Sequence, residues 1–166
     1  TGEEIRTFSG HRWSITSVAF STDGSQILTG SGQWLSGEAK LWNAATGEEI
    51  RTFSEHRAEI NSVAFSPEGS QMLIGSWERK GRLWDTATGK EIRTFTGHTD
   101  EVTSVAFSPN GSQVLTGSGD ETAKLWDVAT GEEIKTFSGH TWGITSVAFS
   151  LDGSRVLTGS RDGTAI

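Results

Sequence analysis

An eleven-residue phrase recurs four times along the chain and constrains its fold more than any other feature. It reads "TGEEIRTFSGH" from Thr1, "TGEEIRTFSEH" from Thr46, "TGKEIRTFTGH" from Thr88 and "TGEEIKTFSGH" from Thr130. The phrase divides the chain into units 1–45, 46–87, 88–129 and 130–166, of which the last is the shortest. Self-similarity at a period of about 40 residues is typical of proteins built from stacked copies of one small unit. We therefore expect a single repeat domain over residues 1–166.

Each unit contains the same succession of short segments rich in β-branched and aromatic residues. In the first unit these are "EIRTFS" at residues 4–9, "ITSVAF" at 15–20, "SQILTGS" at 25–31 and "AKLW" at 39–42. Turns such as "SPEG" and "SPNG" separate them, where proline presets φ and glycine supplies the left-handed position. Because no window repeats its apolar residues at the helical period, the sequence predicts four strands per unit and no helix.

The dipeptide "GH" ahead of the first inner strand and "LWD" at the end of the third resemble the WD40 repeat family. The resemblance covers essentially the whole chain. It implies an all-β fold, a β-propeller with four blades per chain, in which each blade is a four-stranded antiparallel sheet. In such a propeller each unit begins with the outermost strand of the preceding blade and then supplies three inner strands of its own. Repeats as uniform as these resemble those of bacterial members.

The resemblance also implies a hydrogen-bonded set in each unit. It joins the histidine of "GH", a hydroxyl on the second inner strand, an aspartate in the following turn and the tryptophan of the third, so that each buried donor finds an acceptor. Unit by unit, the candidates are His11, Thr29 and Trp42; His56 and Trp84; His98, Thr116, Asp120 and Trp126; His140, Thr158 and Asp162. In the first unit Gln33 stands near the aspartate position, and in the second Ile74 and Glu78 replace the hydroxyl and the aspartate. Such uneven substitution favours a structural role over a catalytic one.

No motif in the sequence indicates an enzyme. It contains no phosphate-binding loop, no paired histidines at metal-ligand spacing and no Gly-x-Ser-x-Gly motif, so we expect no catalytic residues, no metal and no cofactor. A net charge of −7 argues against nucleic-acid binding, which needs clustered Lys and Arg. No apolar stretch is long enough for a membrane span, and there is no cysteine. We expect a cytoplasmic protein.

The positions where the units differ indicate a binding surface. Of the seven tryptophans, four lie outside the "LWD" motif: two just after a "GH" histidine and two between the second and third inner strands. In a four-stranded antiparallel blade these two connections lie on the same face of the disc. Exposed Trp and Arg are the side chains that most often anchor protein interfaces. The candidate partner-binding residues are Trp13, Trp34, Trp77, Trp142, Arg12, Arg57, Arg79 and Asp100. The insertion within "QWLSG", residues 33–37, should protrude from this face.

The order of the strands predicts how the ring closes. The fourth unit supplies three inner strands, from 144–150, 155–160 and the short segment 164–166, but no outer strand, whereas residues 4–9 are an outer strand without a blade. Four blades would each have to subtend about 90°, against about 50° in the usual ring of roughly seven. Two chains would give eight blades at about 45° each. We therefore expect a head-to-tail homodimer in which residues 4–9 of each chain complete the last blade of the other.

Three functions are compatible with this sequence. The first is a non-catalytic scaffold that binds a protein or peptide partner, as WD40 proteins typically do. The second is a glycan-binding propeller, because repeated tryptophans on a symmetric face can stack on sugars. The third is that the chain is a fragment or an engineered piece of a longer propeller. The fold alone does not choose among them.

Overall fold

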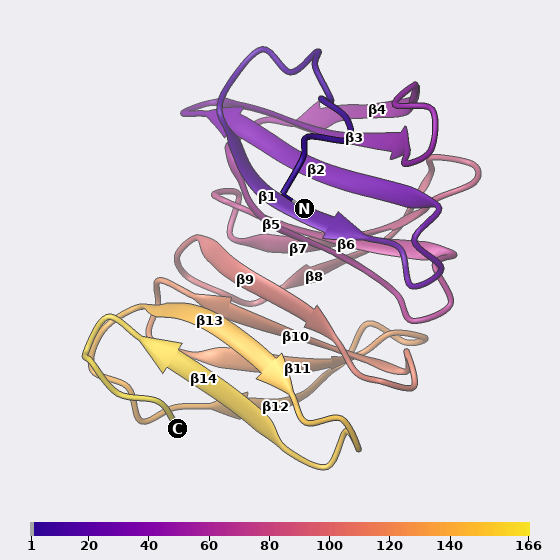
Figure 1. Ribbon diagram of the computed structural model, residues 1–166. Coiled ribbons are helices and arrows are strands. Elements are labelled where there is room, and N and C mark those ends of the chain that lie inside the picture. Colours follow the sequence, from indigo (N-terminus) through magenta and orange to yellow (C-terminus); the bar gives the residue numbers. More distant parts are fainter. Residues whose placement is uncertain (1) are drawn as a thin grey trace.

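The computed structural model describes residues 2–166, except the side chains at positions 55 and 56, and within this range the fold is all-β without helices (Figure 1). Three antiparallel sheets have four strands each, and a fourth sheet has two. The first sheet comprises β1 (Ile15–Phe20), β2 (Gln26–Gln33), β3 (Ser36–Asn43) and β4 (Glu49–His56). The second comprises β5 (Ile60–Phe65), β6 (Gln71–Ser76), β7 (Lys80–Asp85) and β8 (Glu91–Thr96). The third comprises β9 (Val102–Phe107), β10 (Gln113–Ser118), β11 (Ala123–Asp127) and β12 (Glu133–Phe137), and the fourth β13 (Ile144–Phe149) and β14 (Val156–Ser160).

The sheets are offset from the sequence units by one strand, as predicted. The strands follow one another in sequence order within each sheet, so each pairs with its chain neighbour. The last strand of the first sheet, β4, begins at Glu49 and thus belongs to the second sequence unit; β8 and β12 stand in the same relation to the third and fourth units. Units 46–87, 88–129 and 130–166 therefore each contribute to two sheets.

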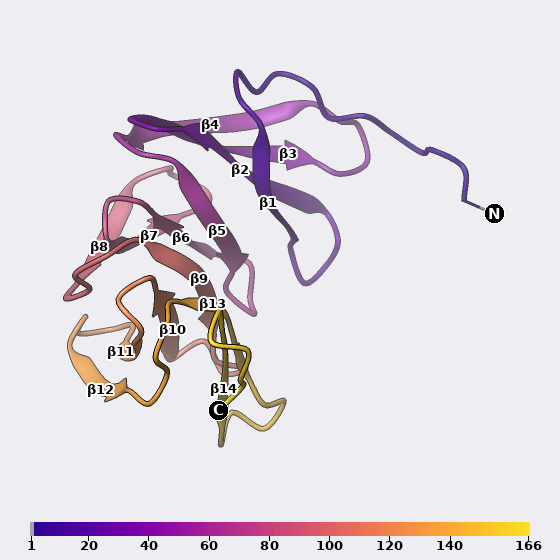
Figure 2. The same ribbon diagram turned by 90° about the vertical axis from the view of Figure 1, so that its left-hand side faces the viewer.

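The sheets stack face to face in an arc, with β1, β5, β9 and β13 along its inner side and β4, β8 and β12 along its outer side (Figure 2). Apolar side chains of β5, β9 and β13 are buried against the preceding sheet, as Ile60 and Val63 of β5 are against Leu28. This approach requires a glycine on the second strand of each of the first three sheets. A Cβ on Gly30 would lie 2.6 Å from Cγ2 of Ile60 and 3.0 Å from Cγ1 of Val63, so only glycine fits.

Two predicted segments differ from the structure at the ends of the arc. Residues 164–166, expected to form a third strand of the last sheet, pair with β14 over a short stretch: the backbone N–H groups of Thr158 and Ile166 donate to each other's carbonyls at 2.9 Å, around an isolated bridge between Gly159 and Ala165. The pairing is antiparallel, as expected, but too short to form a full strand. The last sheet therefore has two strands instead of four.

Residues 4–9 form no strand and are largely exposed, and the chain extends from the first sheet toward its N-terminal end (Figure 2), but two side chains contact that sheet and its β3–β4 connection. The Arg6 guanidinium donates to the carbonyl oxygen of Thr46 at 2.7 Å, and the ring of Phe8 contacts that of Trp42 edge-on at 5.9 Å. The two ends of the chain are not joined, so the sheets form an open arc. Completion of the last blade by residues 4–9 of another chain stays a prediction.

Candidate functional site

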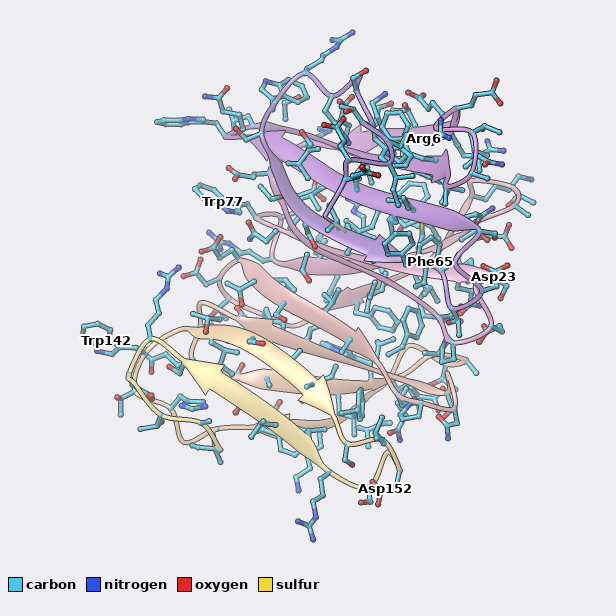
Figure 3. The ribbon with its side chains drawn as sticks, in the orientation of Figure 1. Arg6, Asp23, Phe65, Trp77, Trp142 and Asp152 are labelled. Atoms are coloured by element: carbon cyan, nitrogen blue, oxygen red, sulfur yellow. The ribbon has the colours of Figure 1, made fainter. Side chains whose placement is uncertain are left out.

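The connections predicted to share a face do so. Trp77, in the β6–β7 connection, and Trp142, in the β12–β13 connection, point out at one end of the stacked sheets, whereas Asp23 and Asp152 occupy turns at the opposite end (Figure 3). Trp34 lies in the β2–β3 connection, equivalent to that of Trp77, and Trp13 precedes β1 as Trp142 precedes β13. We call this end the tryptophan face.

Burial separates two classes of tryptophan. Trp42, Trp84 and Trp126, at the "LW" positions, are no more than 3% exposed and form part of the core. On the tryptophan face Trp34 is 74% exposed, Trp142 63% and Trp77 50%. Trp13 is only half-buried and borders a small hollow beside Arg12 and Glu38. Three of the four predicted aromatic anchors are therefore well exposed.

The insertion near Gln33 forms the tip of a long hairpin. It extends β2 and β3 to eight residues each, and the last pair, Gln33 opposite Ser36, leaves a two-residue turn. Trp34 occupies the first turn position with φ 57°, and Leu35 next to it is 86% exposed. The sequence analysis missed Leu35, although its place beside Trp34 in the insertion was a usable signal.

A hollow of about 430 Å³ lies beside Trp77, where the inner strands β1, β5, β9 and β13 and their neighbouring connections converge. Its lining residues are Thr16, Glu59, Asn61, Trp77, Glu101, Thr103, Thr145 and Arg161. The indole N–H of Trp77 donates to Asn61 Oδ1 at 3.2 Å, and Asn61 Nδ2 donates to Glu101 Oε2 at 3.0 Å. Asn61 thus holds the tryptophan edge and one carboxylate oxygen, leaving the indole face half exposed. The sequence analysis missed Glu59 and Asn61; the signal for the latter was an asparagine where the other units have threonine.

The four predicted charged residues are all exposed at this end. Arg12 and Arg57 directly follow "GH" histidine positions, Arg79 lies in the β6–β7 connection, and Asp100 precedes β9. Arg79 has φ 64°, a conformation that glycine favours. The side chains of Asp100 and Arg79 lie on different connections, and no hydrogen bond joins them within the described part of the chain. The face therefore carries dispersed charges of both signs around its tryptophans.

The third unit contains the complete hydrogen-bonded set. His98 Nε2 lies 2.7 Å from Thr116 Oγ1, to which the Trp126 indole N–H donates at 2.9 Å. His98 Nδ1 lies 2.9 Å from Asp120 Oδ2, which also accepts the backbone N–H of Thr99 at 2.9 Å. Since the Thr116 hydroxyl oxygen accepts the indole N–H, its own O–H can donate to Nε2 of the imidazole, and the opposite ring nitrogen, Nδ1, donates its N–H to the carboxylate.

Burial and hydrogen bonding shift the pKa values of His98 and Asp120 in opposite directions. Burial lowers the pKa of the His98 imidazole below its usual value, although the Asp120 carboxylate opposes the shift. Burial alone would raise the pKa of Asp120, but hydrogen bonds from Thr122, Thr99 and His98 outweigh it and lower the pKa. A neutral histidine beside an ionised carboxylate is a stable hydrogen-bonded pair, consistent with a structural part of the sheet.

In the first unit a glutamate takes the place of the missing aspartate. Glu38 Oε1 accepts from His11 Nδ1 at 3.0 Å and from the backbone N–H of Arg12 at 3.2 Å, while Thr29 Oγ1 lies 2.6 Å from His11 Nε2 and accepts the Trp42 indole N–H at 2.8 Å. Gln33, which stands near the aspartate position in the sequence, is not the replacement. The lengthened hairpin carries Gln33 past the histidine and brings Glu38 on β3 opposite it.

In the second unit, where Glu78 takes the aspartate position, this carboxylate belongs to an ion-pair network. Glu78 accepts the backbone N–H of Arg57 at 2.6 Å and pairs with the Arg82 guanidinium at 2.5 Å, and Arg82 also pairs with Glu91 at 2.7 Å. The side chain of His56 lies outside the described residues. In the fourth unit His140 contacts Asp162 at 2.8 Å and Thr158 at 2.9 Å.

Two further observations concern chemistry and membranes. The described side chains include no group of three or more histidine, cysteine, aspartate or glutamate residues placed to hold a metal ion. In residues 2–166 no helix has the length and apolar character needed to cross a membrane.

Comparison with protein families gives one result. The family model described as "WD domain, G-beta repeat" matches residues 2–43, 47–85, 89–127 and 131–166, which together span nearly the whole chain. These matches coincide with the four sequence units. A search of curated proteins found no match.

Proposed function

Because the chain belongs to the WD40 repeat family, whose members generally act as protein-interaction scaffolds, we propose that it is a non-catalytic scaffold. Its tryptophan face binds a protein or peptide partner. One observation carries this proposal: Trp34, Trp77 and Trp142 are exposed at one end of the molecule, although a buried tryptophan would avoid the cost of hydrating an indole. Large rigid aromatic side chains anchor interfaces because they bury much apolar area with little loss of side-chain entropy.

The hollow beside Trp77 supports a partner with a positively charged side chain. Glu59 and Glu101 both line it, and neither carboxylate forms an ion pair with a described side chain. A cation in the hollow would meet two carboxylates and the half-exposed indole, which attracts cations through its ring face. Arg161, which follows β14, also lines the hollow, so a bound cation should lie nearer to the two carboxylates than to its guanidinium.

The experiment compares peptides selected from a random library by the wild-type chain and by a Trp34→Ala, Trp77→Ala, Trp142→Ala variant. We expect the triple variant to lose affinity for the selected peptides by at least about 100-fold, because interface tryptophans are among the most costly residues to truncate. Its melting temperature should stay near that of the wild type, since all three side chains are exposed.

The matched control is Leu151→Ala, in the β13–β14 turn at the opposite end, where Leu151 is 99% exposed. It should leave peptide binding unchanged. Selected peptides that bind the triple variant as well as the wild type would contradict the proposal. A glycan array measured with the same variants tests the alternative: tryptophan-dependent binding of sugars but not of peptides would favour a glycan-binding propeller.

The proposal extends to the assembly that presents this face. Two copies of the chain, associated head to tail, form an eight-bladed ring in which residues 4–9 of each copy complete the last blade of the other. The open arc of sheets supports this, because both of its ends present sheet surface that is buried between sheets elsewhere in the same chain. The alternative is that a further blade of a longer chain covers these exposed sheet surfaces.

A further inference from the structure

We infer that each junction in this ring is a copy of the internal junctions, made by the β1 face of one copy on the β13–β14 face of the other. The inference rests on the proposed ring and assigns the groups that form its two seams. It follows from three features that repeat at every internal junction and are left half-formed at the two ends of the arc.

The first feature is apolar packing against a glycine. At the internal junctions Ile60 and Val63 are at most 6% exposed, and the equivalent pairs on β9 and β13 are buried as well. On β1 the corresponding residues Ile15 and Val18 are 47% and 66% exposed. The complementary surface is open at the other end of the arc: Leu157 of β14 is 56% exposed, whereas its counterparts Leu28, Leu73 and Leu115 are fully buried.

Gly159 indicates which side chains can pack on the open β13–β14 surface. A Cβ on the equivalent Gly117 would lie 2.6 Å from both Ile144 and Val147 of the next sheet, whereas a Cβ on Gly159 would have no atom within 4 Å. The same absence of a side chain at this position provides room for a neighbouring isoleucine and valine. Ile15 and Val18 of a second copy are the matching pair.

The second feature is a hydrogen bond across each junction. The backbone N–H groups of Val63, Val105 and Val147 donate to the hydroxyls of Ser17, Ser62 and Ser104, each at 3.1 Å. In this series the next acceptor is the Ser146 hydroxyl and the remaining donor is the Val18 N–H. No described residue of the chain joins them, and a second copy in the same geometry would.

The third feature is the position of residues 4–9. Arg51 of β4 donates to the Ala87 carbonyl, as Arg6 does to that of Thr46, and Phe53 contacts Trp84 edge-on at 5.7 Å, much as Phe8 contacts Trp42. Residues 4–9 thus make the contacts of an outer strand with the following sheet, without belonging to a sheet. Ala123 pairs with Phe137 in the third sheet, so the equivalent pairing places Phe8 of the second copy opposite Ala165.

The test is the mass of the chain by size-exclusion chromatography with light scattering at micromolar concentration. We expect twice the 17.8 kDa chain mass for the wild type. Gly159→Ala and Val18→Ser should each raise the dimer dissociation constant by at least about tenfold, because a methyl group or a polar group then occupies a packed seam. Ile92→Thr, at an exposed apolar residue on β8 of the second sheet and thus away from both seams, is the control and should stay dimeric.

The outcomes separate the seam from the rest of the proposal. A wild-type monomer, or an open-ended oligomer that grows with concentration, would overturn the closed ring. A dimer that Gly159→Ala and Val18→Ser leave intact would overturn the seam while a dimer of another kind stands. The binding of peptides by the tryptophan face is measured separately and survives either result, because its tryptophans lie on loops within each copy. Gly159→Ala should not affect the fold of the single chain, since the added methyl group meets no atom there.

Discussion

Removal of the Asp120 side chain tests whether the hydrogen-bonded set of the third sheet is structural. Asp120 accepts from His98 Nδ1 at 2.9 Å, from the Thr99 N–H at 2.9 Å and from the Thr122 N–H at 3.1 Å. His98 is buried, so in Asp120→Ala its ring N–H loses the carboxylate acceptor, and the Thr122 hydroxyl that remains nearby is 3.5 Å away, at the limit of a hydrogen bond. Leaving one buried polar group without a partner costs about 1–3 kcal/mol of unfolding free energy. We expect Asp120→Ala to lower stability by that amount.

Urea denaturation followed by tryptophan fluorescence measures this loss, because Trp126 is buried in the same set. Asp120→Asn keeps a carbonyl acceptor and should lose less. Asp152→Ala is the comparison at an exposed turn, where the carboxylate bonds only Ser150 and Ser154, and its effect should be smaller. The structural reading fails if Asp120→Ala keeps its unfolding free energy but abolishes binding of peptides to the tryptophan face.

Three other changes test the packing, the turns and the pH dependence. Gly117→Ala should lose about 1–3 kcal/mol of stability in thermal denaturation, because its Cβ would lie 2.6 Å from Ile144; an unchanged melting temperature would contradict the close packing. Glu121→Gly should raise stability by up to about 1 kcal/mol, because Glu121 has φ 71° and the equivalent residue is Gly163 with φ 85°; urea midpoints below that of the wild type would contradict this. Because the pKa of His98 is lowered in the folded chain, its imidazole is protonated at a higher pH in the unfolded chain than in the folded one, so stability falls as pH drops below about 6.5. The slope of melting temperature against pH from 7.5 to 5 should therefore be shallower in His98→Gln.

The repeated phrases predicted the strands, their order and the offset between units and sheets because each of these depends on local sequence. Alternation, turn residues and period are present in every unit, so one reading applies to all. The same reasoning placed Trp77 and Trp142 on one face, since in an antiparallel sheet alternate connections lie at the same end. The ends of the arc were less predictable: residues 164–166 pair with β14 over a short stretch without forming a full strand, and residues 4–9 form no strand.

The site was predicted less completely than the fold. Glu38 was missed because the insertion before it changes which residue of the hairpin lies opposite His11, and sequence position alone does not show that shift. The hollow beside Trp77 was missed because its lining comes from all four sheets, so the approach of Glu59 and Glu101 depends on how the sheets stack. The exposure of Trp34 and Trp142 could be predicted because their connections lie on the tryptophan face, whereas the half-burial of Trp13 depends on the neighbouring β2–β3 hairpin.

The offset of one strand between sequence unit and sheet affects how such a chain can change in length. Units 46–87, 88–129 and 130–166 each end one sheet and begin the next, so an internal unit inserted or removed leaves every strand with the same kind of neighbour. Recombination between units would therefore alter the number of blades without creating a new junction to be optimised. Selection on chain length would then act mainly through curvature: the wedge angle between sheets, set in part by Gly30, Gly75 and Gly117, determines which numbers of blades complete a circle.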